Sequence, residues 1–503
     1  MSLTVAIARG KPEYPREAPF HPGEPFPEAR FAPPGRGTEP NGVYALVREV
    51  FTLLGWDSAR VGTPLWNPLA QLIHPGDTVV LKPNFVRDFH ETDRSLDGLL
   101  TTHGSVIRAV CDYCQLALQG RGRLVVADAP QNDADFEVLR QRAGLESIAE
   151  VYRSGGGVPL EVYDLRPECA EKIDGVIVGH RALRGDPAGY VRVDLGSQSA
   201  FAEVHDLCDR LYGAEYDQRE VVAHHHGGVH EYLVSRTVLD ADVVISLPKL
   251  KTHKKVGVTL NLKNLVGING NKNWLPHYRL GTPAQGGDQF DREGVKHRAE
   301  IHALNAFKRL FPYLGPMRRA VAAPVKALGK RVFGDTDRGT VRSGNWHGND
   351  TAWRMAIDLG RVLLFSDPRG TLHDTPQRRY LSVVDAVVGG EGDGPLAPRP
   401  RPVGAIVAGT DPVAVDLVCT QLMGFDARRL PILARATEPH PLPLTTCGSD
   451  DVTCLSNHRP WSGPMGSLPA VDPPFAPHFG WRGAIEASSP AGVMSSAATE
   501  SRT

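Results

Sequence analysis

The chain carries the stretch Asp242-Val-Val-Ile-Ser-Leu-Pro-Lys-Leu-Lys-Thr-His-Lys-Lys-Val-Gly-Val-Thr-Leu-Asn-Leu-Lys-Asn-Leu-Val-Gly267. Its apolar run Val243–Leu247 has the length of a buried strand and ends at Pro248, which cannot continue a central strand. Clustered cations and amides follow: Lys249, Lys251, His253, Lys263 and Asn264. Because ligands of open α/β sheets collect at the carboxyl ends of the strands, the stretch predicts a site there. Ammonium and amide donors suit a carboxylate or phosphate.

The bulk composition narrows the class of protein. The chain has 503 residues, 41% of them apolar, and a net charge of −1. This balance carries no nucleic-acid or membrane signature, and no apolar run is long enough for a membrane span. The first ten residues lack the pattern of a signal peptide, and seven scattered cysteines fit a reducing compartment. We therefore expect a cytoplasmic protein, with its oligomeric state left open.

Apolar runs and helical patterns alternate along the chain. The predicted strands cover residues 78–81, 124–127, 243–247, 381–384 and 403–408. The predicted helices cover residues 42–55, 105–119, 136–143, 299–311, 351–365 and 411–423. Such alternation predicts an α/β fold with a mostly parallel sheet and helices on both faces.

Four segments are expected along the chain. A proline-rich N-terminal arm covers residues 1–42, and proline fits extended surface chain better than a helix or central strand. One α/β domain covers 43–430, with an irregular insertion at about 153–240. A C-terminal extension covers 431–460. Residues 461–503, rich in Pro, Gly, Ser and Ala, are predicted to be a disordered tail.

Polar residues follow three predicted strands and precede one predicted helix. Lys82 and Asn84 follow the first strand, Asp128 follows the second, and His103 stands just before the helix at 105–119. We expect these residues to share one pocket with the cations after Leu247. Lys249 and Lys251 are two apart, so an extended chain would point them to the same side. The alternative for each residue is an ordinary cap or turn.

The expected roles follow from side-chain chemistry. His253 or His103 would be the general acid or base, because the ordinary histidine pKa lies near working pH, and Lys251 would assist. The expected substrate-binding residues are Lys82, Asn84, Lys249, Lys263, Asn264 and Lys272.

A divalent metal is a further hypothesis. Asp128, His277, Asp288 and Glu391 combine carboxylates with an imidazole, as hard and borderline divalent ions prefer. Their spacing fits no defined metal motif, and a glycine-rich surface loop with solvated charges is the alternative. Cys111 and Cys114 lie within a helical pattern without a second cysteine pair, so an iron–sulfur cluster is not expected.

The motifs together resemble a bacterial and archaeal family, domain of unknown function 362 (DUF362), in its longer subgroup. The matching pieces are Leu-Lys82-Pro-Asn84, Thr101-Thr-His103, Val-Ala-Asp128, Leu-Pro-Lys249-Leu-Lys251-Thr-His253, Leu-Lys263-Asn264-Leu-Val-Gly267, Val-Val-Asp385 through Glu391-Gly-Asp-Gly-Pro395, and Thr410-Asp411-Pro-Val-Ala-Val-Asp416. Some relatives carry an appended ferredoxin-like cluster module, and this chain lacks such a cysteine run. The resemblance therefore implies a family and no particular reaction.

We expect an enzyme that acts on a small anionic metabolite, carboxylated or phosphorylated, with the possible help of a divalent metal. Two alternatives stay open. One is a cofactor-dependent redox or racemase-like enzyme. The other is a non-catalytic ligand-binding or assembly protein, which would need the cations without an acid or base.

Overall fold

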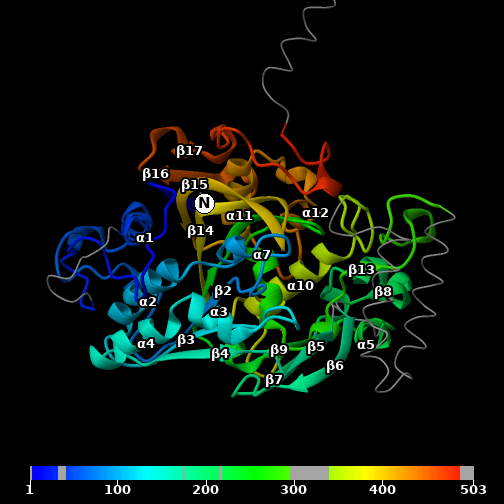
Figure 1. Ribbon diagram of the computed structural model, residues 1–503, viewed down its shortest axis with the longest axis horizontal. Helices are drawn as coiled ribbons and strands as arrows, with labels where there is room; N and C mark the ends of the chain where they lie inside the picture. The colour runs from blue at the N-terminus through cyan, green and yellow to red at the C-terminus, as the bar shows by residue number, and fades with distance from the viewer. Residues whose placement is uncertain (1–2, 32–40, 174–175, 214–217, 295–338, 488–503) are drawn as a thin grey trace, which may run out of the picture.

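A large mixed sheet runs through the middle of the protein (Figure 1). The structure is a computed structural model that describes residues 3–31, 41–173, 176–213, 218–294 and 339–487. Across the sheet the strands are β17 (Gly463–Pro464), β16 (Val452–Ser456), β1 (Leu3–Arg9), β15 (Ala397–Gly409), β14 (Arg379–Asp393), β10 (Val243–Leu247), β2 (Thr78–Pro83), β3 (Arg123–Asp128) and β4 (Leu160–Asp164). Off this path, β11 (Lys249–His253) pairs with β14 and with β12 (Gly257–Thr259).

Most strand pairs that place the site are parallel. From β14 through β10, β2 and β3 to β4, each neighbour runs parallel to the next. The other half is mixed, because β15 pairs antiparallel with both β14 and β1. The predicted α/β class with a mostly parallel sheet is confirmed, and β2, β3 and β10 end at the same edge.

Helices cover both faces of the sheet (Figure 1). Successive strand residues point to opposite faces, so Val79 and Leu81 join one apolar core and Val80 joins the other. The first core also holds residues of α1 (Gly42–Leu53), α2 (Gly104–Leu118), α3 (Phe136–Arg142) and α4 (Leu145–Ser154). The second holds residues of α7 (Asn261–Asn264), α10 (Ala352–Phe365), α11 (Pro412–Met423) and α12 (Pro431–Ala434).

The helix predictions hold where the structure describes the chain. In α11, Asp411 accepts a hydrogen bond from the Ala414 N–H, Pro412 occupies the first turn, and Gly424 ends the helix with φ of 81°. The predicted helix at 299–311 lies outside the described residues.

The predicted insertion at 153–240 contains three small pieces of sheet and one strand of the main sheet. β5 (Glu168–Ile173) pairs with β6 (Val176–Ala182), β7 (Tyr190–Asp194) with β9 (Glu231–Ser235), and β8 (Leu211–Tyr212) with β13 (Tyr278–Arg279). Two short helices, α5 (Gln218–Ala223) and α6 (Arg236–Leu239), lie between them. The prediction of an insertion is wrong for β4, which lies within 153–240 but forms the edge of the main sheet beside β3.

Both ends of the described chain enter the main sheet, which corrects two predicted boundaries. β1 belongs to the segment predicted as a surface arm, yet it lies between β15 and β16. β16 belongs to the predicted extension and pairs parallel with β1. The continuous apolar run Val5–Ala8 outweighs the proline-rich chain after it, because all four residues are fully buried.

The predicted disordered tail is corrected for residues 461–487, which pack against the domain. Phe475 and Trp481 are buried, and the Trp481 indole N–H donates to the Lys254 carbonyl at 2.8 Å. Six large apolar side chains in this proline-rich segment are buried and anchor it: Trp461, Met465, Leu468, Phe475, Trp481 and Ile485. Residues 488–503 lie outside the described residues.

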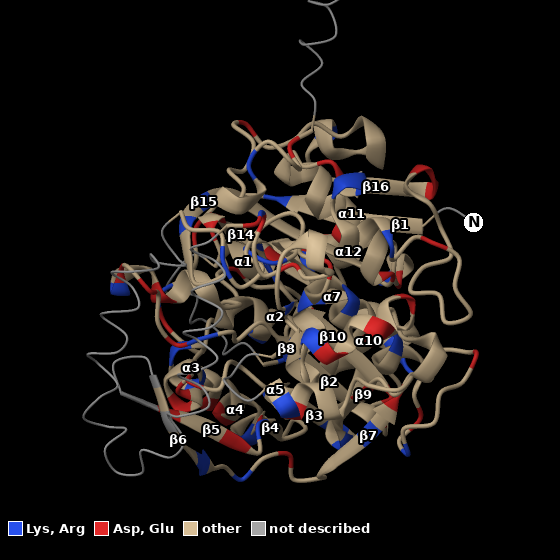
Figure 2. Cartoon of the chain, turned by 90° about the vertical axis from the view of Figure 1, so that its right-hand side faces the viewer, with Lys and Arg blue, Asp and Glu red and all other residues tan. Residues whose placement is uncertain are grey.

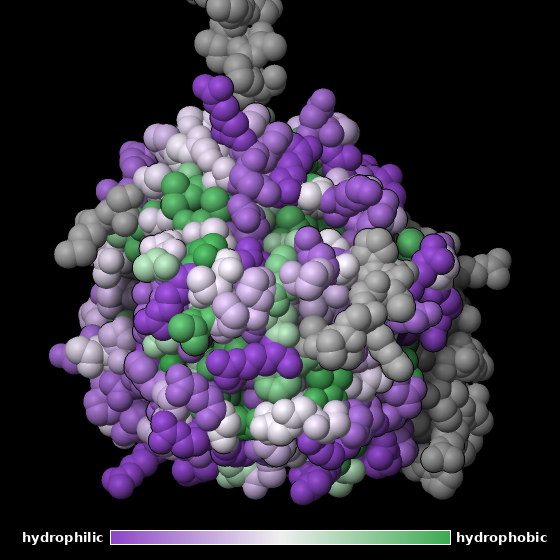
Figure 3. All heavy atoms as spheres, turned by 90° about the vertical axis from the view of Figure 1, so that its left-hand side faces the viewer, coloured by the Kyte–Doolittle hydropathy of each residue, from purple (hydrophilic) through white to green (hydrophobic). Residues whose placement is uncertain are grey.

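Basic and acidic residues are interspersed along the chain in Figure 2, as the net charge of −1 suggests. On the face that carries α1 and α2, apolar side chains show in small groups between hydrophilic ones (Figure 3). Among the described residues, no helix has both the length and the apolar character that crossing a membrane requires.

Candidate functional site

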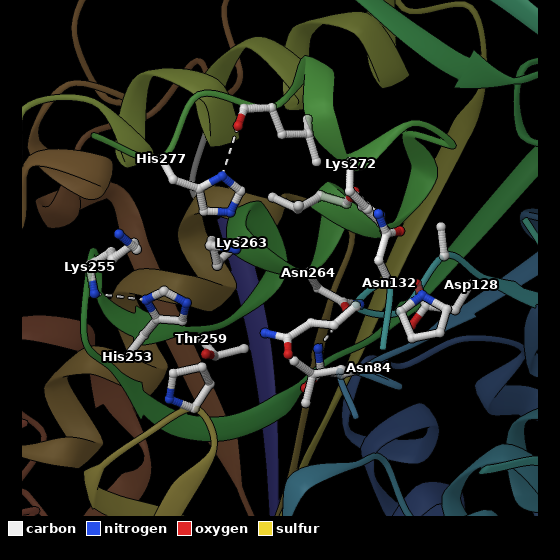
Figure 4. A pocket seen from close by; sticks show the side chains of 18 of the residues that line it. Asn84, Asp128, Asn132, His253, Lys255, Thr259, Lys263, Asn264, Lys272 and His277 are labelled. Atoms are coloured by element: carbon white, nitrogen blue, oxygen red, sulfur yellow. Dashed lines mark hydrogen bonds between the residues drawn. The ribbon is translucent and has the colours of Figure 1, made fainter. Parts of the chain in front are cut away.

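A cavity of about 230 Å³ lies where β2 and β3 end, beneath the segment that runs from β11 to His277 (Figure 4). Nine of the residues predicted from the sequence line it: Lys82, Asn84, Asp128, Lys251, His253, Lys263, Asn264, Lys272 and His277. The walls also include Lys254, Lys255, Thr259, Gln131, Asn132 and Asp133. Cations outnumber anions in this lining, so the cavity favours negative charge.

Lys82 and Asp128 neutralise each other at the floor of the cavity. The ammonium lies 2.7 Å from Asp128 Oδ1, and both side chains are buried. Lys82 Nζ also donates to the Pro83 carbonyl at 2.7 Å, and Asp128 Oδ2 accepts from the Phe85 N–H at 2.8 Å. Burial lowers the pKa of Lys82, while the carboxylate opposes that shift. This pair therefore stabilises the strand ends and leaves other lysines to meet a ligand.

Gly267 makes room for this ion pair. A Cβ at this position would lie 1.9 Å from Asp128 Oδ1 and 2.6 Å from Lys82 Nζ. The Gly267 carbonyl accepts from the Ala129 N–H at 2.9 Å, which fixes the backbone against the end of β3. Glycine is therefore required here by close approach.

Amide side chains hold α7 against the end of β2. Asn264 Nδ2 donates to the Lys82 carbonyl at 3.0 Å and to Ser246 Oγ at 3.1 Å. Its Oδ1 accepts from Lys82 Nζ at 3.1 Å and from Asn84 Nδ2 at 3.3 Å. Asn84 and Asn264 thus orient each other and fix the helix that carries Lys263 (Figure 4).

A buried carboxylate caps the same helix from the other side. Asp416 in α11 accepts from the Asn261 N–H at 2.8 Å, from Asn261 Nδ2 at 2.8 Å and from the Leu262 N–H at 3.0 Å. Burial raises the pKa of Asp416 to about 7. Asp416 stands in the family motif but was not predicted as a site residue. Its role is to position α7.

Lys263 is a cation of the wall with no ion-pair partner in the part of the chain that the structure describes. It makes no hydrogen bond or ion pair with any residue the structure describes, and burial, aided by Lys82, lowers its pKa to about 8. Lys272, in the 3₁₀ turn Lys272–Trp274, donates to the Asn269 carbonyl at 2.9 Å. Burial lowers the pKa of Lys272 to about 7. An anion in the cavity would stabilise both ammonium groups.

Two neutral histidines face the cavity on the side of Lys263 (Figure 4). The Lys255 N–H lies 3.0 Å from His253 Nδ1, which must therefore accept, so the His253 proton sits on Nε2. His277 Nδ1 lies 2.7 Å from the Leu275 carbonyl, which only accepts, so its proton sits on Nδ1. Burial and the nearby lysines lower the pKa of His253 well below its usual range and that of His277 to about 3.

Lys249 and His103 lie in a separate buried cluster, which corrects the prediction of one shared pocket. Lys249 Nζ lies 3.1 Å from Asp385 Oδ2, and the His103 N–H donates to the same oxygen at 3.0 Å. Tyr14 donates to Asp385 Oδ1 at 2.6 Å and stacks on the His103 ring at 4.2 Å. Burial lowers the pKa of His103 to about 4. The cluster ties the N-terminal segment to β14.

An irregular strand register between β11 and β14 sends Lys249 and Lys251 to different places, although on a regular extended chain both side chains would point to the same side. Lys249 pairs with Asp385 of β14 and Lys251 with Gly390, so β14 advances five residues while β11 advances two. Such a bulge redirects the side chains that follow it. Lys251 lines the cavity, with its Nζ donating to the Leu100 carbonyl, while Lys249 does not line it.

The predicted metal ligands are not brought together. Asp128 and His277 line the cavity, but Asp288 accepts from Thr351 Oγ1 at 2.6 Å and from the Arg279 N–H at 2.6 Å elsewhere. Glu391 accepts from the Ala476 N–H at 3.0 Å. In the described ranges no three His, Cys, Asp or Glu residues gather as a metal group would require. The surrounding lysines would also repel a divalent cation, so we derive no metal-dependent step.

Comparison with protein families identifies the chain. The family model of a domain of unknown function, DUF362, matches residues 162–421, just over half of the sequence. The chain belongs to the DUF362 family. The match contains the β10–β11 stretch, α7 and most of α11, and so covers much of the cavity wall of this DUF362 protein.

One curated relative is a thylakoid-associated protein of Synechocystis sp., which is 24% identical over 202 residues. The aligned part is 40% of this DUF362 protein and 38% of the relative, so the chain spans well under two thirds of that relative's length. The name of the relative gives a location and no reaction.

Sequence reasoning missed part of the wall of this DUF362 protein. Lys254 and Lys255 stood in the quoted lysine run without a role, and Asn132 follows β3 by four residues. All three lie just beyond strand ends, which is the signal that could have found them.

Proposed function

We propose that this DUF362 protein is an enzyme that acts on a small carboxylated or phosphorylated metabolite, with the cavity at the ends of β2 and β3 as its active site. The observation that carries the proposal is Lys263. It lines the cavity without a hydrogen bond or ion pair to the described part of the chain, which is costly for a largely buried cation unless an anion balances it.

Lys263 and Lys272 would hold the anionic group. Charge-assisted hydrogen bonds contribute about 1.5–3 kcal/mol each, and they strengthen where water is excluded. Asp416 and Asn264 would act as positioning residues, since both fix α7, on which Lys263 stands.

The histidines supply one hydrogen-bond donor and one base. His253 offers an N–H at Nε2 that can donate a hydrogen bond to a substrate oxygen on which negative charge develops, and His277 offers a lone pair at Nε2 that can accept a proton. Burial, together with the positive charge of Lys255 and Lys263, lowers the pKa of His277, and a bound anion would offset that charge. The pKa of His277 would then move back toward its usual range. His103, the other predicted acid or base, lies outside the cavity.

The first test measures anion binding by isothermal titration calorimetry with inorganic phosphate, malate and citrate. Lys263→Met should weaken the tightest of these at least tenfold, as loss of one charge-assisted contact implies. Lys11→Met is the matched control, because Lys11 is exposed and does not line the cavity. Equal affinity of Lys263→Met and the unmodified protein would refute the anion site.

The second test separates an enzyme from a binding protein. Purified protein is incubated with a mixture of small anionic metabolites, and consumption is followed by mass spectrometry. His253→Phe and His277→Phe should abolish consumption while the affinity for inorganic phosphate stays within about tenfold. If no metabolite that binds is ever converted, the non-catalytic alternative holds.

A further inference from the structure

The two histidines in the cavity wall present opposite hydrogen-bonding functions. Backbone partners fix both tautomers: the Lys255 N–H donates to His253 Nδ1, and the Leu275 carbonyl faces His277 Nδ1. His253 Nε2 therefore carries a hydrogen, and His277 Nε2 carries a lone pair. Neither Nε2 atom has a hydrogen-bond partner among the residues that the structure describes, and His253 is only 7% exposed.

Burial and nearby positive charge keep His277 in its acceptor form. Burial is the larger cause, and Lys255, Lys263 and Lys272 add to it, so its pKa is about 3 and a second proton on the ring is disfavoured near neutral pH. Lys263 and His253, which lie on the same side of the cavity, are hydrogen-bond donors. His277 Nε2 is thus an acceptor that a simple deprotonated anion cannot satisfy.

We propose that the substrate carries a hydroxyl group beside its anionic group, and that the hydroxyl donates to His277 Nε2. The anionic group would meet Lys263, and His253 Nε2–H would donate to an oxygen of the same ligand. An ammonium group could also donate to His277, but the three lysines around that ring would repel it. The inference rests on the proposed function, because it assumes that the cavity binds an anion at Lys263.

The size of the cavity sets the scale of the ligand. At about 230 Å³ it lies below the roughly 300–1,000 Å³ of drug-sized sites. A four-carbon hydroxy acid or a three-carbon hydroxylated phosphate ester is of suitable size. Both share the proposed chemistry, and the experiment separates them.

The test compares ligands that differ only in the hydroxyl group. Malate, succinate and aspartate have one carbon skeleton with a hydroxyl, a hydrogen or an ammonium at the second carbon. 2-Hydroxypropyl phosphate and propyl phosphate form the phosphate pair. By calorimetry, the hydroxylated member of the pair that binds should bind about 10- to 100-fold tighter than its partners. The pair that binds reports whether the anionic group is carboxylate or phosphate.

Three variants connect the preference to its residues. His277→Phe keeps a flat ring but removes the acceptor, so the hydroxylated and plain ligands should bind equally. His277→Asn, whose Oδ1 can accept, should retain part of the preference and guards against loss of folding in the first variant. Lys263→Met should weaken both ligands of a pair by a similar factor and leave their ratio unchanged.

The outcomes distinguish this inference from the proposed function. If the ligands of each pair bind with equal affinity, and this binding is lost in Lys263→Met, the hydroxyl inference is overturned but the anion site stands. A hydroxyl preference that survives His277→Phe would also overturn it. Absence of binding by all five compounds would overturn the proposed function together with the inference.

Discussion

Gly267→Ala should destabilise the protein strongly, because the new methyl group has no space. Its Cβ would lie 1.9 Å from Asp128 Oδ1 and 2.6 Å from Lys82 Nζ. Moving the side chains would break a buried ion pair, which costs about 3–5 kcal/mol. Moving the backbone instead would break the Ala129 N–H···O=C bond to Gly267, at about 1–3 kcal/mol, and shift α7 as well.

The free energy of unfolding should therefore fall by about 2–5 kcal/mol, whichever way the protein relaxes. Urea denaturation followed by circular dichroism measures it, with the slope of the transition checked in each protein. Gly98→Ala is the matched control, because no atom lies within 4 Å of a Cβ there and the residue is exposed. A change below about 1 kcal/mol for Gly267→Ala would show that the ion pair is not held as described.

Three further outcomes follow from the site. Anion affinity should fall as pH rises from 7 to 9, because Lys263 and Lys272 lose their protons near pKa values of about 8 and about 7; a flat calorimetric profile would count against this. The pH dependence of stability has the opposite sign in the unliganded protein. Unfolded lysines hold their protons up to the ordinary pKa of 10.5, whereas the native lysines have already released them. The melting temperature should therefore rise between about pH 7 and 10, and it should rise less in Lys263→Met. Asp416→Ala should weaken anion binding at least fivefold and lower stability by about 2 kcal/mol, because α7 loses its cap; unchanged affinity with lowered stability would limit Asp416 to a structural role. Lys251→Met should change stability by no more than about 1 kcal/mol, because relief of a buried charge offsets the lost contact with Leu100; a much lower melting temperature would make Lys251 structural.

Local chemistry made much of the fold predictable. The cap, proline and glycine of α11 stand within one short stretch, and the apolar run of β10 ends at a proline. Such signals need no knowledge of distant residues. They were also enough to place polar groups at the ends of β2, β3 and β10, which is why most of the predicted binding residues line one cavity.

Long-range contacts decided what the sequence could not show. The register shift between β11 and β14 places Lys249 beside Asp385, and the sequence of the lysine run does not predict this shift. Asp288 resembles a metal ligand in sequence, but its carboxylate accepts a hydrogen bond from Thr351, which is distant along the chain. Trp481 stabilises a segment of otherwise disorder-prone composition by packing beside the loop of Lys254. In each case the partner is distant in sequence, where composition and periodicity give no information.

The position of β1 has a consequence for synthesis of the chain. Its two neighbours in the sheet, β15 and β16, are residues 397–409 and 452–456, whereas β1 itself is residues 3–9. At about 5–20 residues per second, the ribosome completes β16 roughly 20–90 seconds after it has made β1. Until β15 is made the strand has both edges open, and until β16 is made it still has one, a state that invites pairing with other chains. Efficient production of this protein should therefore depend on a chaperone that shields the nascent N-terminal strand, and on slow dilution from denaturant when it is refolded in the test tube.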